Sequence, residues 1–307
     1  MPSSQPGEPI HEAAGRPVVE CFFDRPTGSL QYVFHDPATM KGAIVDPVWN
    51  FCGRAGATST TEADRILAHV EARGIEVEWI LDTHPHADHF SAAVYLSDRL
   101  GGVPRGIGAR VVDVQRMWRT FYNDDRIEAD GRQWDRLFND GDSFMVGTIP
   151  VRVTLSPGHT LASISYVAGD AAFIHDTLMM PHCGTSRTDF PGGGADDLWN
   201  TIRAILDLPG DTRLFTGHDY PAPGVEPGYL STVAEQRASN IHVRDGTSRE
   251  DFIASREARD RTLALPDRML HALQVNLRGG RLPKAEADGH SYLKIPLNRF
   301  TPPQSAT

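Results

Sequence analysis

The apolar and polar residues in the first part of the chain predict a β-hairpin. Two β-prone runs, 32–34 and 43–45, flank the turn-forming group Asp36-Pro37-Ala38-Thr39. Because the runs are close in sequence and the turn reverses the chain, we expect two antiparallel strands as the first structured element. Residues 1–20 before them are expected to form a flexible lead.

A helix is predicted after the hairpin. Ile66 and Val70 fall on one helical face, and Ser59 and Glu62 have the spacing of a capping box. Gly74 fits the helix stop. In residues 75–81, apolar residues then alternate with glutamates, which predicts a strand.

The remaining patterns predict strands first and helices later. Gly169-Asp170 reads as a hairpin turn, Leu214-Phe215 as a last short strand, and Thr247 with Glu250 as a capping box. Further strands are expected at 144–146, 151–155, 164–167 and 172–174, and helices at 92–100, 198–206, 232–239 and 250–263.

These elements predict an α/β (α+β) fold in which helices cover two mixed β-sheets. The strands come as hairpins with intervening helices and not in strict βαβ alternation. We expect a core domain over residues 21–225 and a helical extension over 226–307 that packs on it.

Composition narrows the class of protein. The 307 residues are 40% apolar and carry a net charge of -10, which argues against nucleic acid as a partner. No run reaches the roughly 20 apolar residues of a membrane span, and the first residues do not have the pattern of a signal peptide. The scattered Cys21, Cys52 and Cys183 favour a reducing compartment, and we expect a cytoplasmic protein.

A histidine-rich run directly follows the apolar strand at 75–81. His84, His86, Asp88 and His89 lie within six positions. Imidazole and carboxylate are ligands of borderline divalent metals, so the run favours a metal site over a polar surface loop.

Three further groups follow predicted strands in the same way. They are His159 after Pro157-Gly158, Asp176 before Thr177, and His218 after Gly217. Each residue alone could be an ordinary core or surface residue. All four groups at strand-to-loop junctions indicate one shared metal centre.

The order His-x-His-x-Asp-His, Gly-His-Thr, Asp-Thr-Leu and Gly-His-Asp-Tyr resembles the metallo-β-lactamase superfamily over residues 30–225. The resemblance implies an αββα sandwich of two mixed sheets with the metal site at one edge. It says less about the reaction, because this scaffold hosts many chemistries.

Two branches of the superfamily fit the ligand types. A resemblance to glyoxalase II implies a thioester hydrolase with two Zn(II). A resemblance to the persulfide dioxygenases implies one Fe(II). For two metals, the ligand sets would be His84, His86 and His159, then Asp88, His89 and His218, with Asp176 bridging.

The segment 183–190, Cys-Gly-Thr-Ser-Arg-Thr-Asp-Phe, is similar to a loop of the persulfide dioxygenases, with two extra residues that resemble the bacterial branch. The runs 274–278 and 293–298 also resemble that branch. Carried over by position, His84, His159 and Asp176 would bind iron, and Arg187 and Tyr220 would contact the thiol substrate. His86, Asp88, His89 and His218 would then support the centre. Cys183 is open to either sulfur handling or a structural role.

The resemblance therefore implies a persulfide dioxygenase that converts glutathione persulfide and O2 to sulfite and glutathione, in sulfide detoxification. Its partners would be these small molecules, with a homodimer as the family-based expectation. The alternatives are the di-zinc thioester hydrolase and a non-enzymatic, metal-bearing redox sensor.

Overall fold

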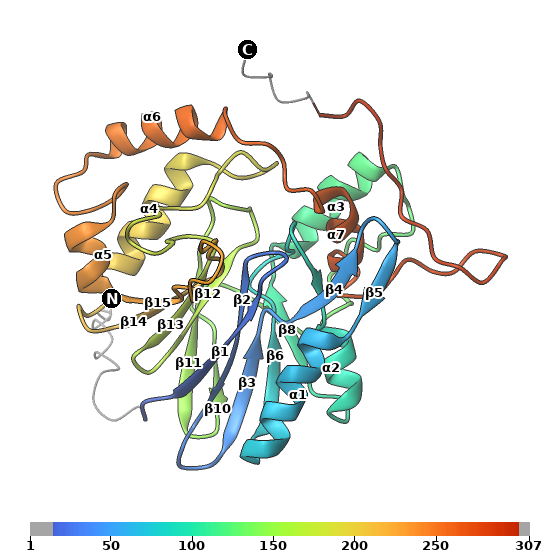
Figure 1. Ribbon diagram of the computed structural model, residues 1–307, viewed down its shortest axis with the longest axis horizontal. Helices are drawn as coiled ribbons and strands as arrows, with labels where there is room; N and C mark the ends of the chain where they lie inside the picture. Colours follow the sequence, from blue (N-terminus) through green and yellow to red (C-terminus); the bar gives the residue numbers. More distant parts are fainter. Residues whose placement is uncertain (1–14, 301–307) are drawn as a thin grey trace, which may run out of the picture.

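Two six-stranded sheets face each other in the computed structural model, which describes residues 15–300. Helices cover the outer faces of both sheets, with α1 and α2 along one and α4 to α6 along the other (Figure 1). This arrangement confirms the expected αββα sandwich. None of the helices within the described residues is long and apolar enough to cross a bilayer.

The first sheet has the order β1-β2-β3-β6-β8-β9. Its first three strands are antiparallel, and β3, β6, β8 and β9 run parallel to one another. The strands are β1 (Val18–Asp24), β2 (Ser29–His35), β3 (Lys41–Val45), β6 (Glu76–Leu81), β8 (Arg105–Gly108) and β9 (Arg136–Phe138).

The second sheet runs from β10 to β15 in chain order. Only its β13–β14 pair is parallel. The strands are β10 (Ser143–Val146), β11 (Ile149–Leu155), β12 (Ile164–Ala168), β13 (Ala171–His175), β14 (Arg213–Thr216) and β15 (Leu230–Thr232). A small third sheet is formed by β5 (Ala57–Ser59), β4 (Val48–Cys52) and β7 (Phe90–Ser91).

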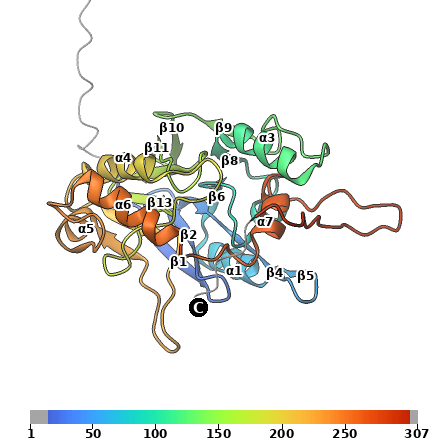
Figure 2. The same ribbon diagram turned by 90° about the horizontal axis from the view of Figure 1, so that it is seen from above.

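The helices pack apolar faces onto these sheets. They are α1 (Thr61–Arg73), α2 (Ala93–Arg99), α3 (Val111–Tyr122), α4 (Ala195–Leu206), α5 (Val233–Ser239), α6 (Arg249–Asp260) and α7 (Met269–Asn276). After α7, residues 281–300 run as a loop, drawn in red, that projects from the body of the protein in both views (Figures 1 and 2).

Aromatic side chains fill the space between the two large sheets. Phe34 of β2 stacks on Phe173 of β13 at 4.9 Å between ring centroids, and Tyr32 meets Phe215 edge-on at 5.4 Å. All four side chains are buried. Burial of each aromatic side chain contributes on the order of 2 kcal/mol to the folding free energy. This layer therefore keeps the two sheets, and the edge at which both end, in a fixed position relative to each other.

Strand β6 departs from the predicted alternation. Its pairing with β3 skips Glu78, because Gly42 pairs with Val77 and Ala43 with Trp79. The bulge changes the phase of the side chains, so Val77 packs under the helices while Trp79 packs between the sheets. The predicted strand is confirmed, but its apolar residues do not share one face, because β6 contacts both core layers.

Both capping boxes predicted beside α1 and α6 are wrong. Ser59 ends β5, and Thr60 caps α1 without a side-chain hydrogen bond. Ser248, not Thr247, caps α6 by accepting from the backbone N–H of Asp251. Gly74 does end α1, as predicted. Its φ of 64° lies in the left-handed region, which glycine adopts without steric cost.

The two ends of the predicted element order also need correction. β1 precedes the predicted hairpin and pairs with β2, so the first element begins at Val18. Most of the flexible lead expected over 1–20 lies outside the described residues. Strand β15 follows β14 and joins the second sheet, so Leu214-Phe215 is not in the last strand. The domain division at residue 226 stays a prediction.

Candidate metal centre

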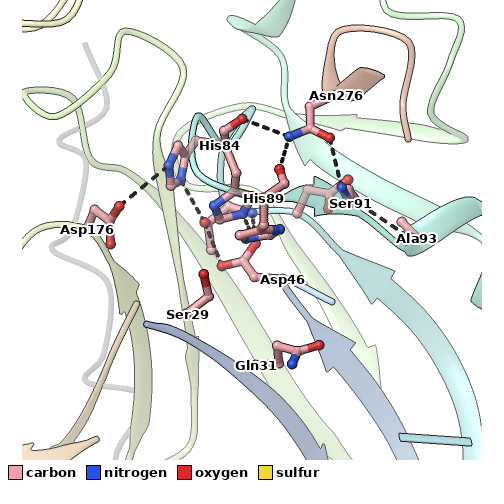
Figure 3. Close-up of polar contacts among 12 residues, drawn as sticks. Ser29, Gln31, Asp46, His84, His89, Ser91, Ala93, Asp176 and Asn276 are labelled. Carbon is pink, nitrogen blue, oxygen red and sulfur yellow. Dashed lines mark hydrogen bonds and ion pairs between the residues drawn. The ribbon is translucent and has the colours of Figure 1, made fainter. Parts of the chain in front are cut away.

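The carboxyl ends of four strands bring the predicted ligand residues together. The histidine-rich run follows β6, His159 follows β11, Asp176 follows β13 and His218 follows β14. The edge where both sheets end is therefore the place where all seven candidate side chains meet. Figure 3 shows His84, His89 and Asp176 at this edge. Asp88 is half-buried and the other six are buried.

Two glycines make this convergence possible. A Cβ on Gly217 would lie 2.4 Å from Oδ1 of Asp176, and a Cβ on Gly158 would lie 2.3 Å from the backbone of Leu198. Gly158 also has a φ of +130°. A side chain at either position would displace the loops that carry Asp176 and His159.

His84, His159 and Asp176 form the first ligand cluster. Their ligand atoms all lie within 4.8 Å of one another. Oδ2 of Asp176 is 3.3 Å from Nε2 of His159 and 3.9 Å from Nε2 of His84. Neighbouring ligands of a metal bound at about 2.1 Å are roughly 3 to 3.5 Å apart, so the cluster fits one ion.

A hydrogen-bond chain orients His84 toward this cluster. The hydroxyl of Thr83 donates to Oδ2 of Asp46 at 2.8 Å, and it lies 3.0 Å from Nδ1 of His84. Because the hydroxyl proton goes to Asp46, the hydroxyl oxygen must accept from Nδ1–H. The lone pair of Nε2 then faces Asp176 and is available to a metal.

Backbone carbonyls orient two more histidines, His159 and His89, and leave the Nε2 lone pair of each free. Nδ1 of His159 donates to the carbonyl of Arg187 at 2.9 Å, and Nδ1 of His89 donates to the carbonyl of Phe90 at 3.0 Å. Burial lowers the pKa of His159, and burial with the neighbouring His86 lowers the pKa of His84 well below its ordinary value. Both triad histidines are therefore neutral, as metal binding requires.

His86, Asp88 and His89 form a second cluster with the same internal spacing. The ring of His86 lies 4.1 Å from the ring of His84 and 4.2 Å from that of His89. Its Nε2 is 2.9 Å from Oδ1 of Asp46, which is an ion-pair distance. Burial lowers the pKa of His86, but the carboxylate of Asp46 outweighs it and raises this pKa to about 9.

Neither ring nitrogen of His86 has a hydrogen-bond partner among the described residues. Such orphaned, buried groups cost stability unless something binds them. The first cluster thus fits metal binding as it stands, whereas the second would bind an ion only after His86 loses its proton and its ion pair with Asp46.

His218 lies between two carboxylates. Nδ1 is 2.6 Å from Oδ1 of Asp176, and Nε2 is 2.8 Å from Oδ2 of Asp88. Burial opposes a charge on His218, but the carboxylates outweigh it and raise its pKa well above the ordinary value. In this arrangement His218 supports Asp176 and Asp88 and offers no lone pair of its own.

The two predicted substrate-binding residues each contact a histidine of the centre, and one of them makes an unexpected ion pair. The guanidinium of Arg187 binds Asp189 through two contacts of 2.6 and 2.7 Å and donates to the carbonyl of Ala264 at 2.6 Å. The backbone carbonyl of Arg187 therefore orients His159, while the guanidinium charge of Arg187 is already neutralised by Asp189. Tyr220 is 73% exposed and stacks on His218 at 5.9 Å.

Cys183 and His175 do not join the ligand clusters. Cys183 is exposed, and partial burial together with Asp219 raises the pKa of its thiol, which does not favour an activated nucleophile. Nε2 of His175 pairs with the hydroxyl of Thr177 at 3.2 Å, and its ring lies 5.4 Å from that of His84.

The sequence did not identify two residues, Asp46 and Asn276, that support the metal centre. Asp46 directly follows β3, so the strand-end signal that selected the histidines could have found it. Asn276 ends α7 and donates to the carbonyls of His86 and His89 at 2.8 and 2.7 Å (Figure 3). It belongs to the 274–278 run, but its distance in sequence from the histidines hid this contact.

Comparison with known proteins places these features in a family. The model of the metallo-beta-lactamase superfamily matches residues 55–218. The beta-lactamase hydrolase-like protein of Xylella fastidiosa (strain Temecula1) is 58% identical over 287 residues, which cover 94% of this chain and 66% of that protein. The chain thus spans just under two thirds of the length of this relative.

Other relatives carry different names. Glyoxylase B2 of Dictyostelium discoideum is 42% identical over 91% of this chain and 97% of that protein. The mitochondrial persulfide dioxygenase of Homo sapiens is 27% identical over 87% of this chain and 91% of that protein. The crystal structure of ETHE1 from Myxococcus xanthus has a TM-score of 0.68 and 28% identity, covering 86% of this chain and all of that one. From its fold, its cluster of histidines and aspartates and these matches, we conclude that the chain belongs to the metallo-beta-lactamase superfamily.

Proposed function

We propose that the chain is a persulfide dioxygenase that uses one Fe(II) held by His84, His159 and Asp176. The substrate would be glutathione persulfide, whose outer sulfur is oxidised with O2 and water to sulfite while the thiol is released. The alignment of the first cluster carries the proposal. Two neutral imidazoles and one carboxylate converge there, as in the two-histidine, one-carboxylate sites of non-haem Fe(II) oxygenases.

The relatives named persulfide dioxygenase support this reaction, although glyoxylase B2 is more similar to this chain, at 42% against 27% identity for the human dioxygenase. Their similarity extends over most of this chain, beyond the residues that match the superfamily model. The carbonyl of Arg187 fixes the tautomer of the triad residue His159, which supports the assignment of His159 as a metal ligand.

The roles of the side chains follow from their contacts. Bound Fe(II) would supply the electrons that activate O2. Thr83 and Asp46 keep the lone pair of His84 directed at the site, and His218 holds Asp176 as a carboxylate. Burial of the cluster limits the access of water to the reactants.

A di-zinc thioester hydrolase is the second candidate. The cluster of His86, Asp88 and His89 favours it, because a second ion would satisfy Nδ1 of His86, which has no hydrogen-bond partner among the described residues. The similarity to glyoxylase B2 points the same way. A cytoplasmic location, a homodimer and the redox-sensor alternative stay predictions from the sequence.

One experiment separates the two enzymes. The protein is purified without added metal, iron and zinc are quantified, and O2 uptake with glutathione persulfide is compared with hydrolysis of S-lactoylglutathione. The proposal expects about one iron per chain and O2 uptake. Two zinc ions per chain with hydrolysis and no O2 uptake would reject it.

Matched variants test the ligand assignment. We expect His84→Ala to lose the iron and His86→Ala to retain most of it, because only His84 is aligned with Asp176. Equal loss of iron in both variants would contradict the one-metal assignment.

A further inference from the structure

A cavity of about 350 Å³ opens beside the metal centre, on the side of His89. Its walls are the β4–β5 hairpin, the turn after β1 and Arg268 at the start of α7. Clefts of this size bind small molecules. None of the residues assigned above to substrate binding lines this cavity, so its role is open.

Arg268 is the unpaired cation of the cavity. Its side chain is half-buried, and no carboxylate among residues 15–300 lies within 4.0 Å of it. Its side-chain hydrogen bond, from Nη1 to the carbonyl of Pro26, is long at 3.4 Å. Arg187, in contrast, is neutralised by Asp189. Arg268 is therefore the better placed of the two to bind the carboxylate of a ligand.

The other walls suit a ligand that joins a carboxylate to a less polar part. Trp49 and Phe51 provide apolar surface beside Arg268. Asp24 is 1% exposed, and its carboxylate already accepts from Asn50 at 3.3 Å and from the hydroxyl of Thr27 at 2.5 Å. The charge that the cavity offers a ligand is therefore that of Arg268.

The cavity is within reach of the first ligand cluster. Ring spacings of 4.2 and 4.1 Å lead from His89 through His86 to His84. A hydrogen-bonded path also runs from Thr27 on the cavity wall through Ser29 to Asp88, with distances of 2.7 and 2.6 Å. An extended chain of three residues spans about 10 Å, so a ligand anchored in the cavity is long enough to cover this distance to the metal site.

We propose that this cavity binds the non-reacting part of the thiol substrate and that Arg268 binds its carboxylate. The inference rests on the proposed function only in taking a glutathione-type thiol as substrate. It adds where the non-reacting part of that thiol binds, and that Arg268 determines the selectivity for its carboxylate.

The test measures binding of S-methylglutathione, which neither candidate reaction consumes. Its affinity for the metal-loaded protein is determined by calorimetry for the wild type, Arg268→Gln and Arg268→Lys. Arg54→Gln is the matched control, because Arg54 is exposed at the tip of the β4–β5 hairpin and does not line the cavity. A thermal melt of each variant verifies folding.

We expect Arg268→Gln to weaken binding about tenfold or more, Arg268→Lys to retain part of the affinity, and Arg54→Gln to match the wild type. For the dimethyl ester of the same ligand, the difference between wild type and Arg268→Gln is expected to vanish. With the true substrate, KM rises while kcat stays unchanged.

Three results would overturn the inference: equal affinities of Arg268→Gln and Arg54→Gln, a difference that persists with the ester, or no binding by the wild type. The proposed function fails separately. A wild type that binds S-methylglutathione through Arg268 but hydrolyses thioesters without O2 uptake would refute the dioxygenase and leave this inference standing.

Discussion

Asn276→Ala is expected to loosen the histidine-rich run from a distance of nearly two hundred residues in sequence. The Asn276 side chain is 2% exposed. It donates to the carbonyls of His86 and His89 at 2.8 and 2.7 Å and accepts from the N–H of Ser91 at 2.8 Å. The substitution leaves these three buried backbone groups without a partner.

The expected loss of stability follows from those three groups. Each unpaired group costs about 1–3 kcal/mol, and partial relaxation of the loop reduces the sum to an expected loss of about 3 kcal/mol. For a domain of this size that corresponds to a decrease in Tm of about 6–12 °C. Because the loop carries His84, metal affinity is expected to fall about 10- to 100-fold.

Asn240→Ala is the matched control. Asn240 is completely buried, donates to the carbonyl of Gly184 at 2.9 Å and accepts from the N–H of His242 at 2.8 Å, but it does not contact the histidine-rich run. Differential scanning fluorimetry and metal analysis of both variants are compared. Similar losses of Tm with metal lost only in Asn276→Ala would support the reasoning. Unchanged metal content in Asn276→Ala, or equal metal loss in both, would refute it.

Three further predictions address the centre and the acid stability. Thr83→Val breaks the chain between His84 and Asp46 and should weaken metal binding about 10-fold or more in chelator competition, whereas Thr83→Ser should restore it. Gly217→Ala places a Cβ against Asp176 and should reduce the metal content. Gly224→Ala is the control, because nothing lies within 4 Å of a Cβ there, although the positive φ of Gly224 makes this substitution cost stability. Equal metal loss in both variants would contradict the steric argument. Burial opposes ionisation of Asp124, but hydrogen bonds from Arg126 and the charge of Arg278 lower its pKa to about 2. Its stabilising contribution is therefore complete above about pH 4 and is lost as the pH falls toward 2, so Asp124→Asn should flatten the dependence of the unfolding free energy on pH in that interval, as measured by urea denaturation of the metal-free protein.

The sequence by itself determined the class of fold and the main ligand types. Hairpin turns such as Gly169-Asp170 and the helix stop at Gly74 depend on a few neighbouring residues, so local patterns predicted them. The run from His84 to His89 was recognisable because its residues adjoin in sequence and follow a strand. The superfamily was identifiable for the same reason.

Only the tertiary structure decided which candidate side chains can bind a metal and which ones support the ligands. The direction of a histidine lone pair depends on what its other nitrogen contacts, and those contacts come from distant segments: Asp46 through Thr83 for His84, and the carbonyl of Arg187 for His159. The phase change at Glu78 and the ion pair that occupies Arg187 also depend on partners far away in the chain. Sequence spacing fixes which residues are neighbours along a strand or loop, but folding decides which charges meet, and this is why the unpaired arginine of the cavity emerged only in three dimensions.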